Sequence, residues 1–225
     1  MIFNNFKKVK VGYLVTFGPS IPKFLFQDLS IIIGCPATKS LQNRLFGLNP
    51  IISVTIKFGL NKDGEPYYNY EFDNKNFQVS DKVHQVIKET ITVQKVNDVA
   101  AMQVFGLINL VTDDKDLEVT LLEPVNKNYN YCDFISGSFY PYGWIRSLNA
   151  SYIQTSDKEA TVRLDVNNNM YRLLFNKPVD LYEVEDTDSI KKYREKMHDI
   201  TSYYKNMKPN LYKRIINKRP KYLLK

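Results

Sequence analysis

Residues 51–72 read IISVTIKFGLNKDGEPYYNYEF and hold the clearest local pattern in the chain. In the first eight residues apolar side chains alternate with mostly polar ones, which is the period of a half-buried strand. Asn61–Gly64 then supplies a turn, because its glycine can take a positive φ, and aromatic and polar side chains alternate after it. The stretch therefore predicts a β-hairpin within a β-rich fold.

Similar runs, separated by Gly, Pro and Asn, continue through residues 1–185. We expect one body there, of class α+β and mostly β: an antiparallel sandwich or barrel-like arrangement of roughly eight to ten strands. A second hairpin is predicted within residues 160–175, with its turn at Asn167–Asn169. Single strands are expected at residues 11–17, 29–34, 117–121 and 179–184.

Residues 80–111 fit both helix and strand. Apolar residues recur at helical spacing after Ser80, which can begin a helix, but the β-branched run Thr90–Val93 also fits a strand. Asp98–Phe105 is the better helix candidate, because an aspartate can cap its start and a glycine follows its end. The body is therefore expected to include a helical insertion around residues 80–106.

Charge divides the chain at about residue 189. Residues 190–225 carry twelve Lys and Arg against Glu195 and Asp199, a net charge of +10, whereas the whole chain carries +7. The preceding residues are therefore slightly acidic, at −3. A strongly basic segment on an acidic body indicates contact with an anionic partner rather than a reaction.

Residues 186–208 have the pattern of an amphipathic helix. Acidic and hydroxyl side chains at residues 185–189 favour a helix start, and Pro209 favours its end. Between them apolar residues recur with spacings of three and four, which is the seam of a heptad repeat and must be buried against the body, another copy or a partner. The seam residues are Ile190, Tyr193, Met197, Ile200, Tyr204 and Met207.

Residues 209–225 show no regular period and are expected to form an extended basic arm. Lys and Arg neutralise phosphates and Tyr rings stack on bases, so DNA or RNA is one candidate partner. Acidic protein surfaces attract the same side chains, and a solvated basic face would need no partner. The cations assigned to the arm are Lys208, Lys213, Arg214, Lys218, Arg219 and Lys221.

Residues 129–144 form a turn-rich stretch that is dense in aromatic residues. Such a stretch often covers the edge of a core or faces a partner. We expect an aromatic interface loop made by Tyr131, Phe134, Phe139, Tyr140, Tyr142 and Trp144.

The chain contains no sequence motif for catalysis or cofactor binding, such as a Walker loop, GxGxxG or GxSxG. Its two cysteines, Cys35 and Cys132, and its two histidines, His84 and His198, have neither catalytic nor zinc-binding spacing. Both cysteines are expected to be buried free thiols. Asp113–Asp116 lacks the spacing of a calcium loop and is expected to be a solvated turn. We expect no cofactor, no metal, no small-molecule substrate and no enzyme activity.

Asn, Lys, Ile, Tyr and Phe are abundant and Ala and Arg are scarce, a bias typical of AT-rich genomes such as those of many phages and large DNA viruses. No apolar run reaches the eighteen residues of a transmembrane helix, and Gln27 and Asp28 interrupt the apolar run that a signal sequence would need before Cys35. We expect a protein that is cytoplasmic or within a virus particle, without a membrane contact.

Two functions follow from these patterns. The first is a non-enzymatic structural or assembly protein, a β-rich subunit of a homo-oligomer or large complex such as a virus or phage particle. Its C-terminal helix and arm would contact copies of itself, other subunits or packaged nucleic acid. The second is a nucleic-acid-binding protein that acts through the basic tail, and a hydrolase with an unrecognised site is a third alternative. The helix seam favours assembly.

Overall fold

The computed structural model describes residues 8–15, 26–28, 40–73, 80–143, 145, 147–202 and 219–224. Within them the chain forms fifteen β-strands and two α-helices, so the prediction of a mostly β protein with a C-terminal helix is confirmed. There are more strands than predicted. The strand predicted at residues 29–34 lies outside the described residues.

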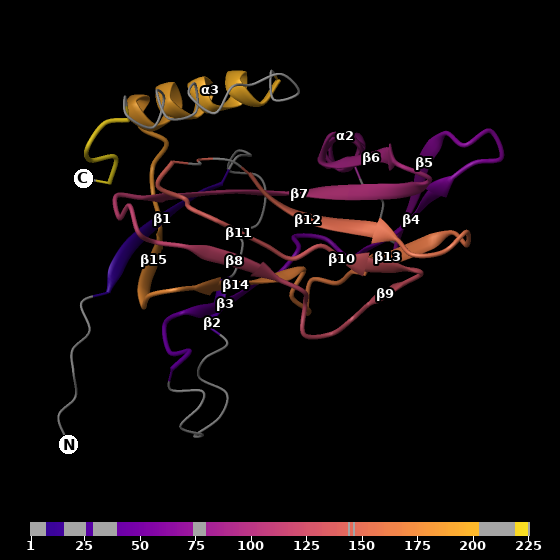
Figure 1. Ribbon diagram of the computed structural model, residues 1–225, viewed down its shortest axis with the longest axis horizontal. Coiled ribbons are helices and arrows are strands. Elements are labelled where there is room, and N and C mark those ends of the chain that lie inside the picture. Colours follow the sequence, from indigo (N-terminus) through magenta and orange to yellow (C-terminus); the bar gives the residue numbers. More distant parts are fainter. Residues whose placement is uncertain are drawn as a thin grey trace.

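The strands pair into three mostly antiparallel sheets (Figure 1). The first sheet contains β10 (Cys132–Phe134), β12 (Ser147–Gln154), β7 (Val99–Thr112), β1 (Val9–Val15) and β15 (Val179–Glu183) in that order, with β6 (Ile91–Val96) also paired to β7. The second contains β11 (Gly137–Phe139), β8 (Val119–Leu122), β14 (Tyr171–Phe175), β3 (Leu45–Leu48) and β2 (Phe26–Asp28). The third contains β5 (Pro66–Phe72), β4 (Val54–Leu60), β13 (Ala160–Leu164) and β9 (Tyr129–Asn130). Among the described strands the pairings leave all three sheets open, so the barrel-like alternative is not found.

β7 organises the first sheet. Its first half pairs with β6 on one side and with β12 on the other, and its last residues pair with β1. β6 and β1 therefore lie end to end along one side of β7, while β12 follows the opposite side. β1 also pairs with β15. This pairing is parallel, whereas the other pairings of the described strands are antiparallel.

The hairpin predicted from residues 51–72 is confirmed as β4 and β5. Val54, Ile56 and Phe58 of β4 are at most 2% exposed and belong to the main core, as their alternation predicts. Gly64 in the connecting turn has a φ of 77°, a conformation that costs a glycine nothing.

Residues 80–111 combine a helix and two strands. The helix α2 spans Asp81–Thr90, and β6 begins at the next residue, so both predictions for this part hold in succession. The helix predicted at Asp98–Phe105 is wrong, because these residues lie at the start of β7 and in the turn before it. Asn97 takes a φ of 55° in that turn. Pairing on both sides of β7 overrides the helical propensity of its Ala and Met residues.

The second predicted hairpin is also wrong, although both of its strands exist. β13 pairs with β4 and β9, whereas β14 pairs with β3 and β8, so the two strands belong to different sheets. Asn167–Asn169 does not use the left-handed conformation that the prediction assumed. Instead the Asp165 carboxylate accepts a hydrogen bond from the Asn167 amide at 2.9 Å, and the Asp165 carbonyl accepts one from the Asn168 amide at 2.9 Å. This turn leads the chain from the third sheet to the second.

β12 carries a signal that the sequence analysis missed. Leu148, Ala150, Tyr152 and Gln154 are all buried, and the residues between them are half-buried, which is a regular period of two.

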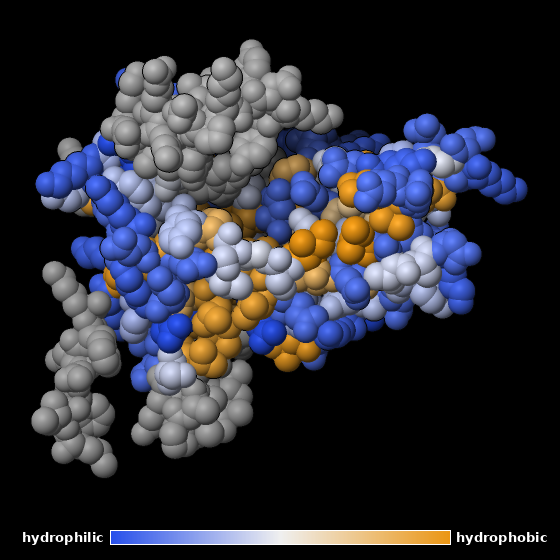
Figure 2. All heavy atoms as spheres, viewed as in Figure 1, coloured by the Kyte–Doolittle hydropathy of each residue, from blue (hydrophilic) through white to orange (hydrophobic). Residues whose placement is uncertain are grey.

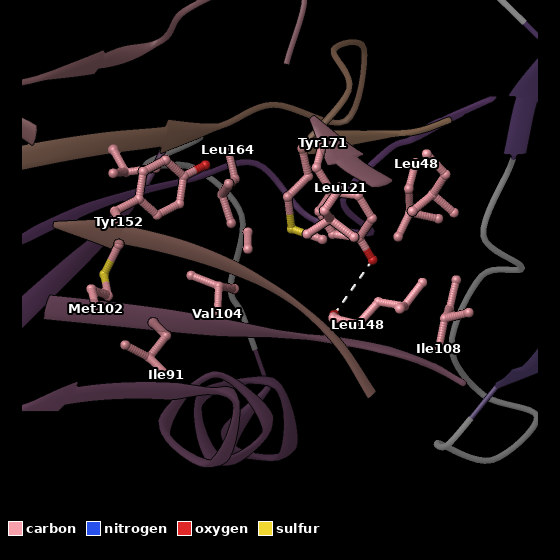
Figure 3. Close-up of a cluster of buried hydrophobic side chains, with 14 of the residues drawn as sticks. Leu48, Ile91, Met102, Val104, Ile108, Leu121, Leu148, Tyr152, Leu164 and Tyr171 are labelled. Atoms are coloured by element: carbon pink, nitrogen blue, oxygen red, sulfur yellow. Dashed lines mark hydrogen bonds between the residues drawn. The ribbon is translucent and has the colours of Figure 1, made fainter. Parts of the chain in front are cut away.

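A contact between β12 and β14 joins the first and second sheets. Tyr171 is fully buried, and its hydroxyl donates a hydrogen bond to the Leu148 carbonyl at 3.4 Å (Figure 3). Gly106 of β7 lies directly beside this pair. A methyl group at Gly106 would overlap the Leu148 carbonyl oxygen and come within 2.5 Å of the Tyr171 hydroxyl oxygen. The pairing of β7 with β12 shifts register at this place, between Ser147 and Asn149.

Candidate functional site

The C-terminal helix α3 spans Asp188–Ser202 and lies along one side of the body (Figure 1). The Thr187 hydroxyl accepts a hydrogen bond from the Ile190 amide at 3.4 Å, which satisfies one amide of the first turn. Ile190 and Tyr193 are 1% and 3% exposed. They pack in a second apolar cluster with Leu14, Val111, Ile145 and Leu223.

The predicted helix seam is thus buried, at its start, against the chain's own body rather than against a partner. The side chains of Met197 and Ile200, and the whole of Tyr204 and Met207, lie outside the described residues.

The opposite side of α3 is basic and solvent-exposed. Lys191, Lys192 and Lys196 are exposed. Arg194 instead pairs with Asp186 at 2.6 Å, which fixes the start of the helix to the segment before it. Three lysines of the helix therefore remain in solvent beside the exposed Glu195, and we call these lysines the basic face.

Arg219, which the sequence analysis assigned to the extended basic arm, is buried. Its side chain has no exposed surface, and its guanidinium pairs with the Asp113 carboxylate at 3.0 Å. Lys221, two residues on, is exposed. Lys208, Lys213, Arg214 and Lys218 lie outside the described residues.

Asp113 receives this C-terminal tail, residues 219–224, through both of its carboxylate oxygens. Oδ1 accepts hydrogen bonds from Arg219 Nη2 at 3.0 Å and from the Leu223 amide at 2.9 Å, and Oδ2 accepts one from the Leu224 amide at 3.0 Å. Arg219 Nη2 also donates to the Thr112 carbonyl. A carboxylate that holds two backbone amides and a guanidinium fixes the position of the whole segment, because such charge-assisted bonds are strong and directional.

Aromatic and apolar side chains complete the seat of the tail. The Arg219 guanidinium carbon lies 4.0 Å from the centre of the Tyr142 ring, a cation–π contact. Leu223 is 5% exposed within the apolar cluster. We define the socket by Leu14, Val111, Thr112, Asp113, Tyr142, Ile145, Ile190 and Tyr193.

The carboxylate next to Asp113 in sequence also binds groups of the same chain. The Asp114 carboxylate binds Lys177 through both oxygens, at 3.0 and 2.9 Å, and also accepts the Asp116 amide at 2.8 Å. These bonds hold the turn that presents Asp113 to the tail. Among the described residues no group of three or more His, Cys, Asp or Glu side chains is arranged to hold a metal ion.

Half of the predicted aromatic interface loop faces inward. The Phe134 ring meets the buried Tyr152 edge-on, with 5.4 Å between centroids, and Phe139 packs against the main core. Tyr142 is half-buried and covers Arg219. These three residues contribute to the fold and to the socket.

The exposed residues of the loop flank β10 and β11. Tyr131 is 47% exposed, Tyr140 is 54% exposed, and Ile135 between them is 45% exposed. Trp144 lies outside the described residues. Figure 2 shows hydrophobic residues in two places on this face, over the part where Figure 1 places β14 and β3 and in a smaller group near β10.

These two consecutive strands occupy the edges of different sheets. β10 ends the first sheet and β11 ends the second, and in the described part of the chain each pairs on one side. We call residues 131–140 the exposed edge. Tyr131, at its start, has a φ of 56°, although a bulky side chain rarely adopts a positive φ.

Cys132 and His84 take structural positions. Cys132 is a buried free thiol, as predicted, and burial followed by the nearby Asp133 carboxylate raises its pKa to about 12. His84 Nδ1 lies 2.9 Å from the Tyr70 hydroxyl, and its ring meets Phe72 edge-on. Cys35 and the side chain of His198 lie outside the described residues.

Comparison with known proteins places the chain in no family: no family model, no curated protein and no solved structure matches it. In the part of the chain that the structure describes, neither helix is long and apolar enough to cross a membrane.

The sequence analysis missed Asp113 and Leu223 as a functional pair. The apolar pair Leu223–Leu224, directly after a strongly cationic stretch, was the available signal that the tail is docked.

Proposed function

We propose that this chain is a non-enzymatic subunit of a homo-oligomer or larger complex, and that a second copy docks on the exposed edge. The observation that carries the proposal is Tyr131. A non-glycine residue held in the left-handed region costs about 1–3 kcal/mol and is often kept for function. Here the strained residue presents a large aromatic side chain to solvent.

The local contacts of Tyr131 explain how its conformation is held. Its carbonyl accepts a hydrogen bond from the Thr155 amide at 3.0 Å, and Lys158 Nζ lies 4.9 Å from its ring centre. These contacts fix the backbone and the ring but leave 47% of the residue exposed. A partner that covers the ring would gain buried aromatic area at a position that is already ordered.

Strand addition is the mode of contact that suits the exposed edge. An edge strand offers a row of backbone amides and carbonyls, and two copies can pair antiparallel about a two-fold axis. Ser136, Gly137 and Ser138 are exposed, so small residues form the start of β11, on which the second copy would lie, and the position before it. Ile135 and Tyr140 would contribute apolar area to the same interface.

The test is the oligomeric state of edge variants, measured by light scattering. Ile135→Asp and Tyr140→Asp are expected to turn the oligomer into a monomer, because each places a charge in the interface. Val96→Asp is the matched control, since Val96 is 36% exposed in the β6–β7 hairpin and lies outside the exposed edge. A wild-type chain that stays monomeric at all concentrations, or edge variants that assemble like Val96→Asp, would contradict the proposal.

Nucleic-acid binding is the second candidate function. The exposed basic face of Lys191, Lys192 and Lys196 on α3 favours it. Each phosphate contact that is lost should reduce the slope of log affinity against log salt by about 0.9 for duplex DNA. If a chain with all three lysines changed to Gln bound DNA with unchanged affinity and salt slope, this face would be excluded as the DNA-binding surface.

A further inference from the structure

The C-terminal tail is held in its socket as a ligand is held in a binding site. Within six residues it contributes one buried cation, two backbone amides to one carboxylate, and one buried leucine. The body supplies matching groups from distant segments: β1, the end of β7, the residues around Tyr142, and α3. The socket therefore recognises a short sequence, arginine followed by a leucine four residues later, with the backbone in a fixed conformation.

The chain between α3 and the tail is long enough for the tail to reach a second molecule. Residues 203–218 connect the end of α3 to Arg219, and sixteen residues extend at most roughly 55 Å. A compact chain of this length has a radius of gyration of about 17 Å. The covalent connection alone therefore permits the tail to reach a socket on an adjoining molecule.

We propose that the socket is an interaction site for the C-terminal tail of a second copy, and that tails are exchanged between neighbouring subunits in the assembled protein. The proposal rests on the proposed function only in requiring that copies meet. The contacts in the exchanged form are those seen here: the guanidinium on Asp113 and Tyr142, two amides on Asp113, and Leu223 in the apolar cluster. Exchange of an identical element forms no new type of contact, so its free-energy cost is low.

Photocrosslinking between isotopically distinct chains tests the exchange. Tyr222 is 61% exposed and belongs to the tail, so Tyr222→p-benzoylphenylalanine places a crosslinker at the rim without emptying the socket. Light and heavy full-length chains are mixed in equal amounts, and the oligomeric state is measured by light scattering in the same sample. With complete exchange and random mixing, about half of the crosslinks should join a light tail to a heavy body or the reverse.

Complementation between two variants makes the result specific to the socket. Asp113→Ala removes the receiving carboxylate and leaves its own tail intact, whereas Arg219→Ala removes the cation of the tail and leaves its own socket intact. Each variant alone should lose tail crosslinking by on the order of a hundredfold, because a buried ion pair is broken. When the two are mixed, the intact tail of the first should crosslink to the intact socket of the second.

Asp98→Ala is the control for Asp113→Ala, since Asp98 is exposed in the turn between β6 and β7 and lies outside the socket. It should crosslink like the wild type, and circular dichroism should show all variants folded. An oligomer in which every crosslink joins a tail to its own body would overturn the exchange and leave the assembly function standing. A monomer at every concentration would overturn both.

Discussion

Gly106→Ala is expected to destabilise the protein more than any other glycine-to-alanine change in β7 or β11. The new methyl group would overlap the Leu148 carbonyl oxygen and stand 2.5 Å from the Tyr171 hydroxyl oxygen, where ordinary contact begins near 3.4 Å. The overlapping atom is backbone in the middle of a paired strand, so it cannot turn aside as a side chain would. β12 must move away from β7, or Tyr171 must leave its place.

The free energy of unfolding should fall by about 3 kcal/mol. Overpacking in a filled core costs about 1–3 kcal/mol, and a lost hydrogen bond between buried groups costs about 1–3 kcal/mol more. Gly→Ala offsets about 0.4–1 kcal/mol of this loss in stability, because alanine restricts the conformations of the unfolded chain. With a urea m-value of about 2–3 kcal/mol/M, the midpoint of unfolding should fall by about 1–1.5 M.

Urea unfolding followed by far-UV circular dichroism measures this change. The control is Gly137→Ala, because a methyl group there meets no atom within 4 Å and should change stability by less than about 0.5 kcal/mol. The double variant Gly106→Ala/Tyr171→Phe should lose less than the sum of its single changes, since one of the two clashes is removed. Equal midpoints for Gly106→Ala and Gly137→Ala would refute the reasoning.

Four further predictions concern Cys132, Asn97 and Tyr131. In a Cys35→Ser background, Cys132 should react with a thiol reagent at pH 8 about a thousandfold more slowly in the folded than in the unfolded chain, since burial raises its pKa from 9.0 to about 12. The stability that this raised pKa contributes is complete below about pH 9 and is lost as the pH rises toward 12, so unfolding midpoints should fall over that window; a midpoint that rises there would contradict the burial. Asn97→Ala should lower stability by about 1 kcal/mol and Asn97→Gly should not, because only Ala is penalised at a φ of 55°. Tyr131→Gly should raise the thermal midpoint, because the backbone strain is relieved, and should weaken self-association, because the exposed ring is lost. If Tyr131 were purely structural, self-association would not change.

The local sequence pattern was sufficient to predict strands and their pairing where one face of each strand is buried and strands that are consecutive in sequence also pair with each other. Residues 51–72 meet both conditions, so their alternation and the turn glycine predicted β4, β5 and their pairing. The pair of strands at 160–175 meets only the first condition. Its strands were predicted correctly, but they do not pair with each other. Two of their partners, β4 and β3, lie more than a hundred residues earlier in the chain, and the other two, β9 and β8, lie more than thirty residues earlier, so no local pattern indicates the pairing.

The candidate site was predicted in composition but not in arrangement. Ile190 and Tyr193 are buried, as a helix seam requires, yet the surface that buries them is built from β1, β7 and the tail of the same chain. Arg219 was counted with the exposed cations because a cation is seldom buried without a partner, and its partner Asp113 stands 106 residues away. Tyr131 was included for its aromatic ring, whereas its positive φ is visible only in the folded backbone.

The parallel pairing of β1 with β15 has a consequence for synthesis on the ribosome. β1 leaves the exit tunnel early, but the strand that covers its outer side is made 164 residues later, roughly 8–33 s at common elongation rates. During that interval the N-terminal strand has an open edge, and β7 can cover only its other side. Closure of the first sheet on this side therefore waits for β15, and a ribosome that stalls before residue 179 would release a product with an unpaired edge, a natural substrate for chaperones.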